Sequence, residues 1–181
     1  MNTYSRRINS GFVLITSLVF LIVLTMIVVS SIRSATLYER AAGNTRNHSQ
    51  AFQAAEFALR QAQFRLVADP PPVAAADDAC NDGLCGKTFD TSIFATASNW
   101  LTDDNKGKSC GVNNADCNKG GAAKVAELPN VTEQPRYVIK KLVPGTDSNP
   151  TCDYFELTSM GVGSSADSAV ILRSIVKSCA S

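Results

Sequence analysis

The sequence predicts an α+β fold in which one long N-terminal helix packs its C-terminal half on a small antiparallel β-sheet. Residues 12–67 contain no proline, and beyond an apolar first stretch their apolar residues recur at close to helical spacing. Three later segments, 136–142, 152–160 and 168–177, have the composition of strands and are separated by turn-rich stretches. The 181 residues allow one domain in addition to the helix.

The helix begins with a stretch suited to a lipid bilayer. Residues 12–32 (FVLITSLVFLIVLTMIVVSSI) carry no charged side chain, and about 20 apolar residues cross the ~30 Å hydrocarbon layer. If helical throughout, residues 12–67 form a rod of about 84 Å, which no compact domain of this size can bury. Arg6 and Arg7 precede the stretch, so the positive-inside rule predicts an N-in orientation. Arg33 follows it and can reach the far interface.

Three interpretations of this N-terminus are open. A secretory signal peptide has a shorter apolar region of roughly 7–15 residues and then a small-residue cleavage site. Here the run is longer, and the helical pattern continues past Ser34 and Ala35, which disfavours cleavage there. The segment could instead be an uncleaved signal anchor. Cleavage before the run, between Gly11 and Phe12, would leave the hydrophobic helix on the mature protein.

The junction at Gly11 and Phe12 carries a resemblance to a known family. Residues 11–18 (GFVLITSL) resemble the class III leader junction of type IV pilins. Residues 34–44 (SATLYERAAGN) and 51–60 (AFQAAEFALR) continue the match, and this run is similar to the N-terminal domain of the PilX minor pilins of type IVa pilus assembly. The specific part of the resemblance covers about a third of the chain.

The resemblance implies the type IV pilin fold and a defined processing pathway. Prepilin peptidase would remove a leader of residues 1–11 after Gly11, and Phe12 would become the N-methylated first residue. Residues 12–33 would cross the inner membrane once and later join equivalent helices in a filament core. The assembly contacts would come from Leu14, Ile15, Thr16, Leu18 and Leu21. The implied partners are the lipid bilayer, the inner-membrane assembly platform, the major pilin, other minor pilins and a tip adhesin.

Thr16 departs from the family pattern. Most pilins have glutamate at this fifth mature position, where its carboxylate pairs with the N-terminal ammonium of a neighbouring subunit. Its absence suits a subunit at the tip, where there is no earlier subunit to pair with. The resemblance therefore implies a minor pilin that helps to initiate type IV pilus assembly and ends at the extracellular tip. The tip-capping pseudopilin of type II secretion shows the same loss and is the nearest competing identity, although it is typically larger, with a substantial helical insertion.

Residues 34–181 are expected to form a periplasmic head. Residues 34–67 continue the helix, in which Gly43 and Asn44 could mark a bend or a locally melted turn. The prolines at 70–72 end it. The helix face expected to pack on the sheet consists of Leu37, Ala41, Phe52, Ala55, Leu59, Ala62 and Leu66.

Residues 70–129 show little periodicity and are expected to form an irregular, partner-facing loop region. Within it, residues 92–94 and 100–101 could dock as short elements. Antiparallel strands are expected within residues 136–179, and both faces of the last strand are partly apolar. One of these faces must cover the long helix.

All six cysteines lie C-terminal to the apolar stretch, which predicts disulfides formed in an oxidising periplasm. Zinc is disfavoured because C-x-x-C pairs are absent and the one histidine, His48, lies within the long helix. If the last hairpin centres near residue 165, opposed residues sum to about 330, which places Cys152 nearly opposite Cys179 and predicts a bond between them. The pairs Cys80–Cys85 and Cys110–Cys117 are plausible local staples, although sequence cannot fix the pairing.

Composition and motifs disfavour other functions. Loss of residues 1–11 would change the net charge from +1 to −1, which argues against a nucleic-acid-binding surface. There is no glycine-rich phosphate loop, no identifiable carboxylate pair and no second histidine for a triad, so neither catalysis nor a cofactor is expected. A membrane-anchored periplasmic binding module, which would keep Arg6 and Arg7, is the alternative to a structural role. Two clusters of oxygen-bearing side chains could hold calcium: Asp77, Asp78 and Asp82, and Asp103, Asp104 and Asn105. Neither cluster has the spacing of an EF-hand loop, so we expect solvated turns there.

Overall fold

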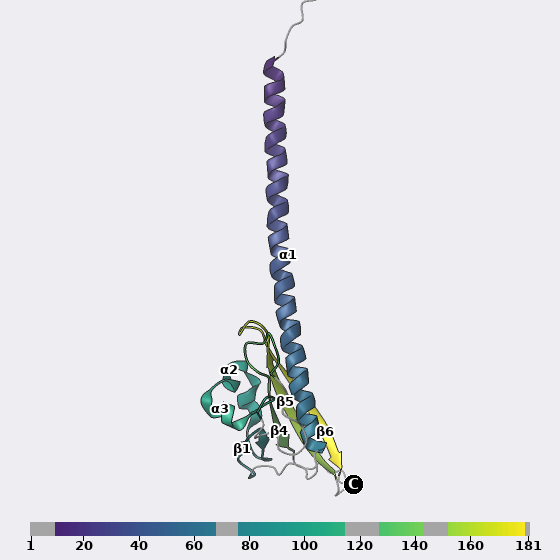
Figure 1. Ribbon diagram of the computed structural model, residues 1–181, viewed down its shortest axis with the longest axis vertical. Coiled ribbons are helices and arrows are strands. Elements are labelled where there is room, and N and C mark those ends of the chain that lie inside the picture. The colour runs from purple at the N-terminus through teal and green to yellow at the C-terminus, as the bar shows by residue number, and fades with distance from the viewer. Residues whose placement is uncertain (1–9, 68–75, 115–126, 143–151, 180–181) are drawn as a thin grey trace, which may run out of the picture. The chain divides into compact units, whose positions relative to one another are not determined.

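The computed structural model describes residues 10–67, 76–114, 127–142 and 152–179. The chain divides into two units, Met1–Gly43 and Asn44–Ser181. One helix, α1 (Ser10–Val67), contributes residues to both (Figure 1). The predicted α+β arrangement, with a long N-terminal helix followed by a sheet, is confirmed.

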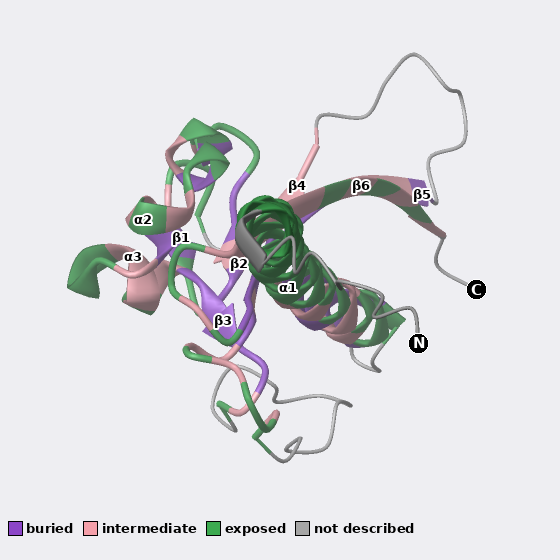
Figure 2. Ribbon diagram, turned by 90° about the horizontal axis from the view of Figure 1, so that it is seen from above, coloured by how far each residue is buried: buried purple, intermediate pink, exposed green. Residues whose placement is uncertain are grey.

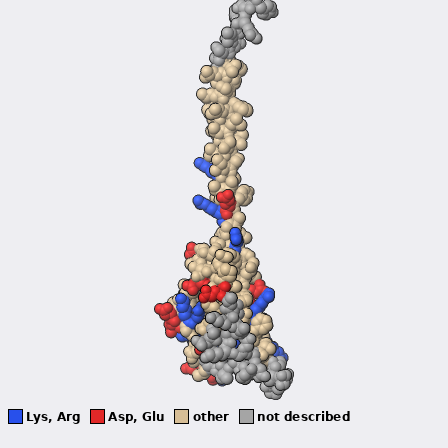
Figure 3. Space-filling model, viewed as in Figure 1, with Lys and Arg blue, Asp and Glu red and all other residues tan. Residues whose placement is uncertain are grey.

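The first unit consists of the N-terminal part of α1, and all side chains of residues 12–43 are exposed. Figure 3 shows the apolar stretch of this helix as a surface without acidic or basic side chains. Its hydroxyls bond to the helix itself: Ser17 Oγ donates to the Leu14 carbonyl at 2.9 Å, and Thr25 Oγ1 to the Ile22 carbonyl at 2.8 Å. Such internal bonds let a hydroxyl reside in an apolar medium without losing a hydrogen bond.

The second unit contains a six-stranded sheet with the order β1-β2-β4-β5-β6, and β3 also pairs with β4. All pairs are antiparallel except β2–β4, which is parallel, whereas the sequence analysis expected an antiparallel sheet. The connection from β2 to β4 is long enough for a crossover, and a crossover is what parallel neighbours need. The strands are β1 (Cys80–Asn81), β2 (Leu84–Cys85), β3 (Cys110–Gly111), β4 (Arg136–Lys141), β5 (Cys152–Val162) and β6 (Ala169–Cys179).

The three strands predicted from the sequence are present, each with bounds within about two residues of those expected. The β5–β6 hairpin runs without interruption from Val162 opposite Ala169 to Cys152 opposite Cys179. The predicted register is therefore confirmed, and the two cysteines lie at the open end of the hairpin.

The two faces of the sheet are covered by different parts of the chain (Figure 2). One face packs on the part of α1 that belongs to the second unit. The other face packs on η1 (Thr91–Ala95) and α2 (Ala97–Trp100), which precede α3 (Asp103–Lys108). The core on the α1 face comprises Ala58, Ala62, Leu66, Cys110, Val112, Tyr137, Ile139 and Leu157. The core on the opposite face comprises Cys80, Cys85, Phe94, Trp100, Val138, Met160 and Val162.

We call residues 91–108 the cap. The segment expected to be irregular thus contains short strands and helices in its described part, residues 76–114. The expectation that residues 92–94 and 100–101 dock as short elements is confirmed. Phe94 and Trp100 are fully buried, their ring centroids lie 4.6 Å apart, and the Trp100 indole donates to the Phe94 carbonyl at 2.8 Å.

The face of α1 that packs on the sheet agrees with the expected one only in part. Ala55, Ala62 and Leu66 are buried as expected, and the half-buried Leu59 packs against the core. Leu37, Ala41 and Phe52 were also expected to pack but are exposed. The buried stripe consists of small residues with one leucine and one arginine: Ala51, Ala54, Ala55, Ala58, Ala62, Arg65 and Leu66.

Gly161 on β5 explains this choice of face. A Cβ at Gly161 would lie 2.3 Å from the Ala55 nitrogen and 2.4 Å from the Ala51 oxygen, so the strand touches the helix backbone. Only small side chains on the helix permit such an approach. The buried face of α1 is therefore the one whose small side chains let β5 come close, and not the one that carries the largest apolar side chains.

Candidate functional site

The residues predicted for processing and assembly lie in the first turns of α1. Gly11 is helical, and Phe12 and Leu21 are 72% and 63% exposed. The other predicted apolar contacts, Leu14, Ile15 and Leu18, are exposed as well. A helix that is apolar on all sides requires lipid or a bundle of similar helices as its surroundings. This helix is long and apolar enough to cross a membrane.

Thr16 lies within this helix and is bonded internally. Its Oγ1 is 3.1 Å from the Phe12 carbonyl oxygen and 3.0 Å from that of Val13. The side chain is uncharged, and the first carboxylate of the whole chain is that of Glu39. The apolar stretch therefore offers no carboxylate to a neighbouring ammonium.

Four of the six predicted disulfide cysteines are disulfide-bonded in the structure. Cys80 and Cys85 are joined to each other. Cys110 and Cys152 are also disulfide-bonded, and none of the described cysteines is free. Cys117 lies outside the described residues. The pairings Cys110–Cys117 and Cys152–Cys179 stay predictions, the second of them consistent with the register of β5 and β6.

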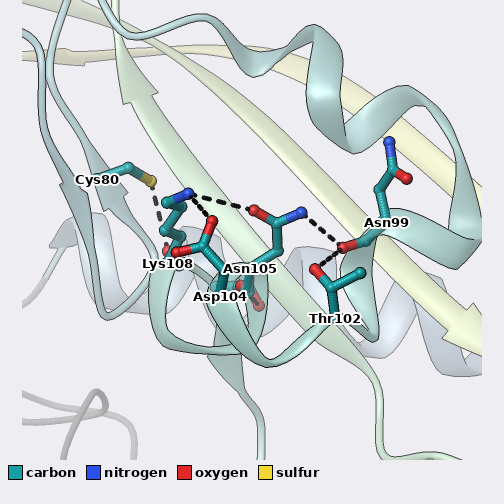
Figure 4. A network of polar contacts seen from close by, with 7 residues as sticks. Cys80, Asn99, Thr102, Asp104, Asn105 and Lys108 are labelled. Atoms are coloured by element: carbon teal, nitrogen blue, oxygen red, sulfur yellow. Dashed lines mark hydrogen bonds and ion pairs between the residues drawn. The ribbon is translucent and has the colours of Figure 1, made fainter.

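Three of the six residues considered for calcium have other side-chain partners. Asp77 forms an ion pair with Lys87 at 2.9 Å. Asp104 forms an ion pair with Lys108 within a polar network at α2 and α3 (Figure 4), and Asn105 donates to the Asn99 carbonyl at 2.8 Å. Within the described residues, no group of three or more metal-binding side chains occurs.

Two arginines hold the hairpin β1–β2 and the cap in place, and sequence reasoning missed both. Arg65, buried on α1, donates to the Asp82 carbonyl at 2.6 Å. Arg136 on β4 donates to the Lys106 and Ser109 carbonyls at 2.5 and 2.9 Å and to Ser109 Oγ at 2.7 Å. These two carbonyls lie at the end of α3, where an arginine side chain can satisfy them. A lone arginine in a sequence gives no sign of this role, because its partners are backbone atoms.

Burial shifts the pKa of two side chains in this region. Loss of solvation lowers the pKa of Arg136, with Glu133 acting weakly in the opposite direction. Loss of solvation raises the pKa of Tyr137, and the nearby Arg65 guanidinium only partly opposes this shift. Both residues pair with β3, Tyr137 opposite Cys110 and Arg136 opposite Gly111. Tyr137 belongs to the core on the α1 face, and Arg136 is half-buried beside it.

Two protein-family models match most of the chain. Residues 10–60 match the PilX N-terminal model, and residues 81–178 match the model of the type IV pilus assembly protein PilX C-terminal region. The second match alone covers more than half of the chain. This chain belongs to the PilX family. Comparisons with curated proteins and with solved structures give no match.

The PilX C-terminal match begins within β1 and ends within β6, so the sheet and the cap together are the family's C-terminal region. The resemblance read from the sequence was specific only for the N-terminal third, and the family match extends it to the rest. PilX proteins are minor pilins of the type IV pilus, and such pilins are structural components of a filament. The family therefore implies contact with other pilus components and anchoring through the apolar helix.

Proposed function

We propose that this PilX-family pilin helps to initiate pilus assembly in the inner membrane and sits at the pilus tip, where it bridges other minor pilins and a tip adhesin. The observation that carries the proposal is Thr16, in an apolar helix whose chain has no carboxylate before Glu39. Leu14, Ile15, Leu18 and Leu21 supply the apolar contacts with equivalent helices.

The energetic argument concerns a buried ammonium. In a filament core, the N-terminal ammonium of one subunit needs a carboxylate from its neighbour. Removing one partner of a buried ion pair costs about 3–5 kcal/mol, because the other charge stays buried and uncompensated. A subunit with Thr16 would impose this cost on the neighbour whose ammonium it should neutralise. At the tip there is no such neighbour, so the cost disappears.

The tip-capping pseudopilin of type II secretion is the second candidate because it shares the missing carboxylate. That protein typically has a substantial helical insertion. In the corresponding part of this chain, the described helical elements η1, α2 and α3 contain only five, four and six residues. This difference favours the pilus subunit.

Intact-mass measurement of the protein purified from native membranes tests the proposal. We expect a mature chain that begins at methylated Phe12 and has lost residues 1–11. A variant with Gly11 replaced by valine should keep the leader and should fail to enter pili, which provides the matched control. A native chain that still begins at Met1 would instead support a membrane-anchored binding module.

We also propose that Cys152 and Cys179 form a disulfide that closes the β5–β6 hairpin. Two observations support this: Cys152 on β5 lies directly opposite Cys179 on β6, and Cys152 is disulfide-bonded. A loop of this length adds about 3–4 kcal/mol of stability in the chain-entropy model. Peptide mapping without reduction should yield a linked pair of peptides containing these two residues.

A further inference from the structure

Strand β6 forms one edge of the sheet. It has 11 residues, and among the described strands it pairs only with β5. Edge strands are usually short, interrupted by proline or bulged, because unpaired backbone groups bind other strands. β6 contains neither proline nor glycine, and its register with β5 is continuous over its whole length. It is therefore an unusually long and regular edge.

Two hydrogen bonds establish which backbone groups of β6 point outward. Leu142 N donates to the Tyr154 carbonyl at 2.8 Å, so the backbone groups of Tyr154 face the β4 side of β5. Gly163 N donates to the Ser168 carbonyl at 2.8 Å, so Gly163 faces the side of β6. Antiparallel ladders alternate. Between Ala169 and Ser178, the residues of β6 whose N–H and C=O groups point away from β5 are Ala169, Ile171, Arg173, Ile175 and Lys177.

The side chains of these five residues share the sheet face opposite to α1, since Ala169 and Ile171 pack on the core beneath the cap. Further along the strand, Ile175 is 65% exposed between two cations. Arg173 lies 3.7 Å from Glu156, and Lys177 lies over the Tyr154 ring at 5.5 Å from its centroid. The strand itself carries two cations and no acid.

The charges decide which strand can pair here. A second copy of β6 would bring four cations into one small patch, and like charges across strands are destabilising. A strand with carboxylates opposite Arg173 and Lys177, and an apolar side chain near Ile175, would satisfy both the backbone and the charges.

We propose that the outer edge of β6 binds an extended acidic segment of another protein, which adds to the sheet as a further strand. Main-chain hydrogen bonds supply the affinity in this mode, and alternate side chains supply the specificity. The proposal rests on the proposed function only in assuming that the head meets other proteins in the assembled pilus.

The first test uses the full-length chain in piliated cells, with the photo-cross-linker p-benzoylphenylalanine at position 175. We expect one major adduct, and mass spectrometry of the cross-linked peptide should map it to an acidic segment of a different protein. An adduct with a second copy, with a basic segment or with a helix overturns the proposal, as does the lack of any adduct in piliated cells.

The second test compares two substitutions at one position. Ile175→Pro removes an outward N–H and leaves the β5 ladder intact, because proline is tolerated at an edge with its nitrogen facing solvent. Ile175→Thr removes the apolar side chain but keeps the N–H. Loss of a backbone hydrogen bond and its neighbours should lower co-purification of the cross-linked protein by about tenfold for proline, and by less than about threefold for threonine. Equal effects of the two variants contradict strand addition.

A charge-reversed variant, Arg173→Glu with Lys177→Glu, keeps the proposal testable if the proline variant does not fold. It should lower co-purification about tenfold, whereas a control reversal at Lys87, outside the sheet edge, should not. Unchanged binding in the charge-reversed chain overturns the acidic partner. Leader cleavage and pilus number, measured in the same strains, report separately on the proposed function.

Discussion

Gly161 determines how closely β5 approaches α1, and through that distance it determines which side of the helix is buried. The contact is between backbones: a Cβ at this position would also lie 2.8 Å from the Ala54 carbonyl carbon. Backbone atoms of a helix cannot rotate away as a side chain can. Gly163 makes a similar approach, since a Cβ there would lie 2.5 Å from the Asn47 oxygen, and the small residues of α1 face this part of the chain.

We predict that Gly161→Ala lowers the free energy of unfolding by about 1–3 kcal/mol or more, because the added methyl overlaps the helix backbone. Gly43→Ala is the matched control. Gly43 lies within α1, and nothing lies within 4 Å of the Cβ it would gain, so this change should not lower stability and should favour the helix by about 1 kcal/mol. Urea unfolding of the detergent-solubilised full chain, followed by circular dichroism, measures both. Equal effects would show that Gly161 is not in close contact.

Asp90 gives a prediction about pH at the start of the cap. Its carboxylate accepts from the Ser92 N–H at 2.9 Å and from the Ser92 hydroxyl at 2.8 Å. These bonds, with a smaller contribution from Lys140, hold the pKa of Asp90 below its ordinary value of 3.8. Because the pKa is lower in the folded state, the stabilisation is complete above about pH 3.8 and is lost as the pH falls through the folded value.

The Asp90→Asn variant isolates this contribution, since asparagine also caps helices but does not ionise. The wild-type protein should have the higher melting temperature at pH 6, and the difference should shrink as the pH falls below about 3.8. A difference that stays constant with pH would mean that the charge of Asp90 does not stabilise the cap.

At the scale of elements, the cap depends on a contact that is made through backbone atoms. Arg136 leaves β4 and binds the last carbonyls of α3, and Arg65 leaves α1 and binds the turn between β1 and β2. Among the described residues, the Arg65 Nε has no hydrogen-bond partner. Both arginines join segments far apart in the chain, so each acts as a tether for a short element that has little stability of its own.

We predict that Arg136→Ala destabilises the head by about 1.5–3 kcal/mol, since its charged hydrogen bonds to the half-buried Lys106 and to the buried Ser109 are lost. Arg136→Lys should recover only part of this, because an ammonium cannot reproduce the planar fork of a guanidinium. Lys106→Ala is the control: it removes a side chain but keeps the carbonyl that Arg136 binds. Thermal unfolding of the three variants measures the effect, and a large loss in the Lys106 variant would contradict the assignment.

The elements differ in how well the sequence predicts them. The long helix and strands β4, β5 and β6 have enough residues to show a period, and the turn between β5 and β6 determines their register. Strands β1, β2 and β3 have two residues each, too few for any pattern, so the parallel β2–β4 pair was not predictable. The alanine stripe was predicted only in part, at Ala55 and Ala62, because its close contact with the sheet depends on Gly161, more than 90 residues away.

The residues of the candidate site also differ in how well the sequence predicts them. The leader junction proposed at Gly11 and Phe12 lies in a local motif, so it can be proposed from sequence alone. The edge of β6 depends on strand order and on the direction of backbone groups, which no local pattern reveals. Phe94 and Trp100 lie between these cases: large apolar residues in a polar stretch predict burial, but the sequence gives no sign of the surface that buries them.

At the scale of the whole molecule, the chain consists of two units with opposite requirements for solvent. Residues 12–43 expose large apolar side chains along the whole helix, whereas residues 44–181 have their own two-sided core. The boundary falls between Gly43 and Asn44, which the sequence analysis named as the place for a bend or a locally melted turn; both residues are helical. Either unit can therefore determine the position of this subunit in a filament. The helix would act through the missing carboxylate at Thr16, and the head would act through its contact surfaces.

Thr16→Glu distinguishes these two origins. A glutamate there would supply the carboxylate that a neighbouring ammonium needs and would remove the cost of about 3–5 kcal/mol that should exclude this subunit from the shaft. We expect the variant to become more abundant relative to the major pilin in sheared filaments, as measured by quantitative mass spectrometry. Thr16→Gln has the same length without the charge and should stay as rare as the wild type. If both variants stay rare, the head surfaces exclude this subunit from the shaft, and the missing carboxylate would then be a consequence of its position and not the cause.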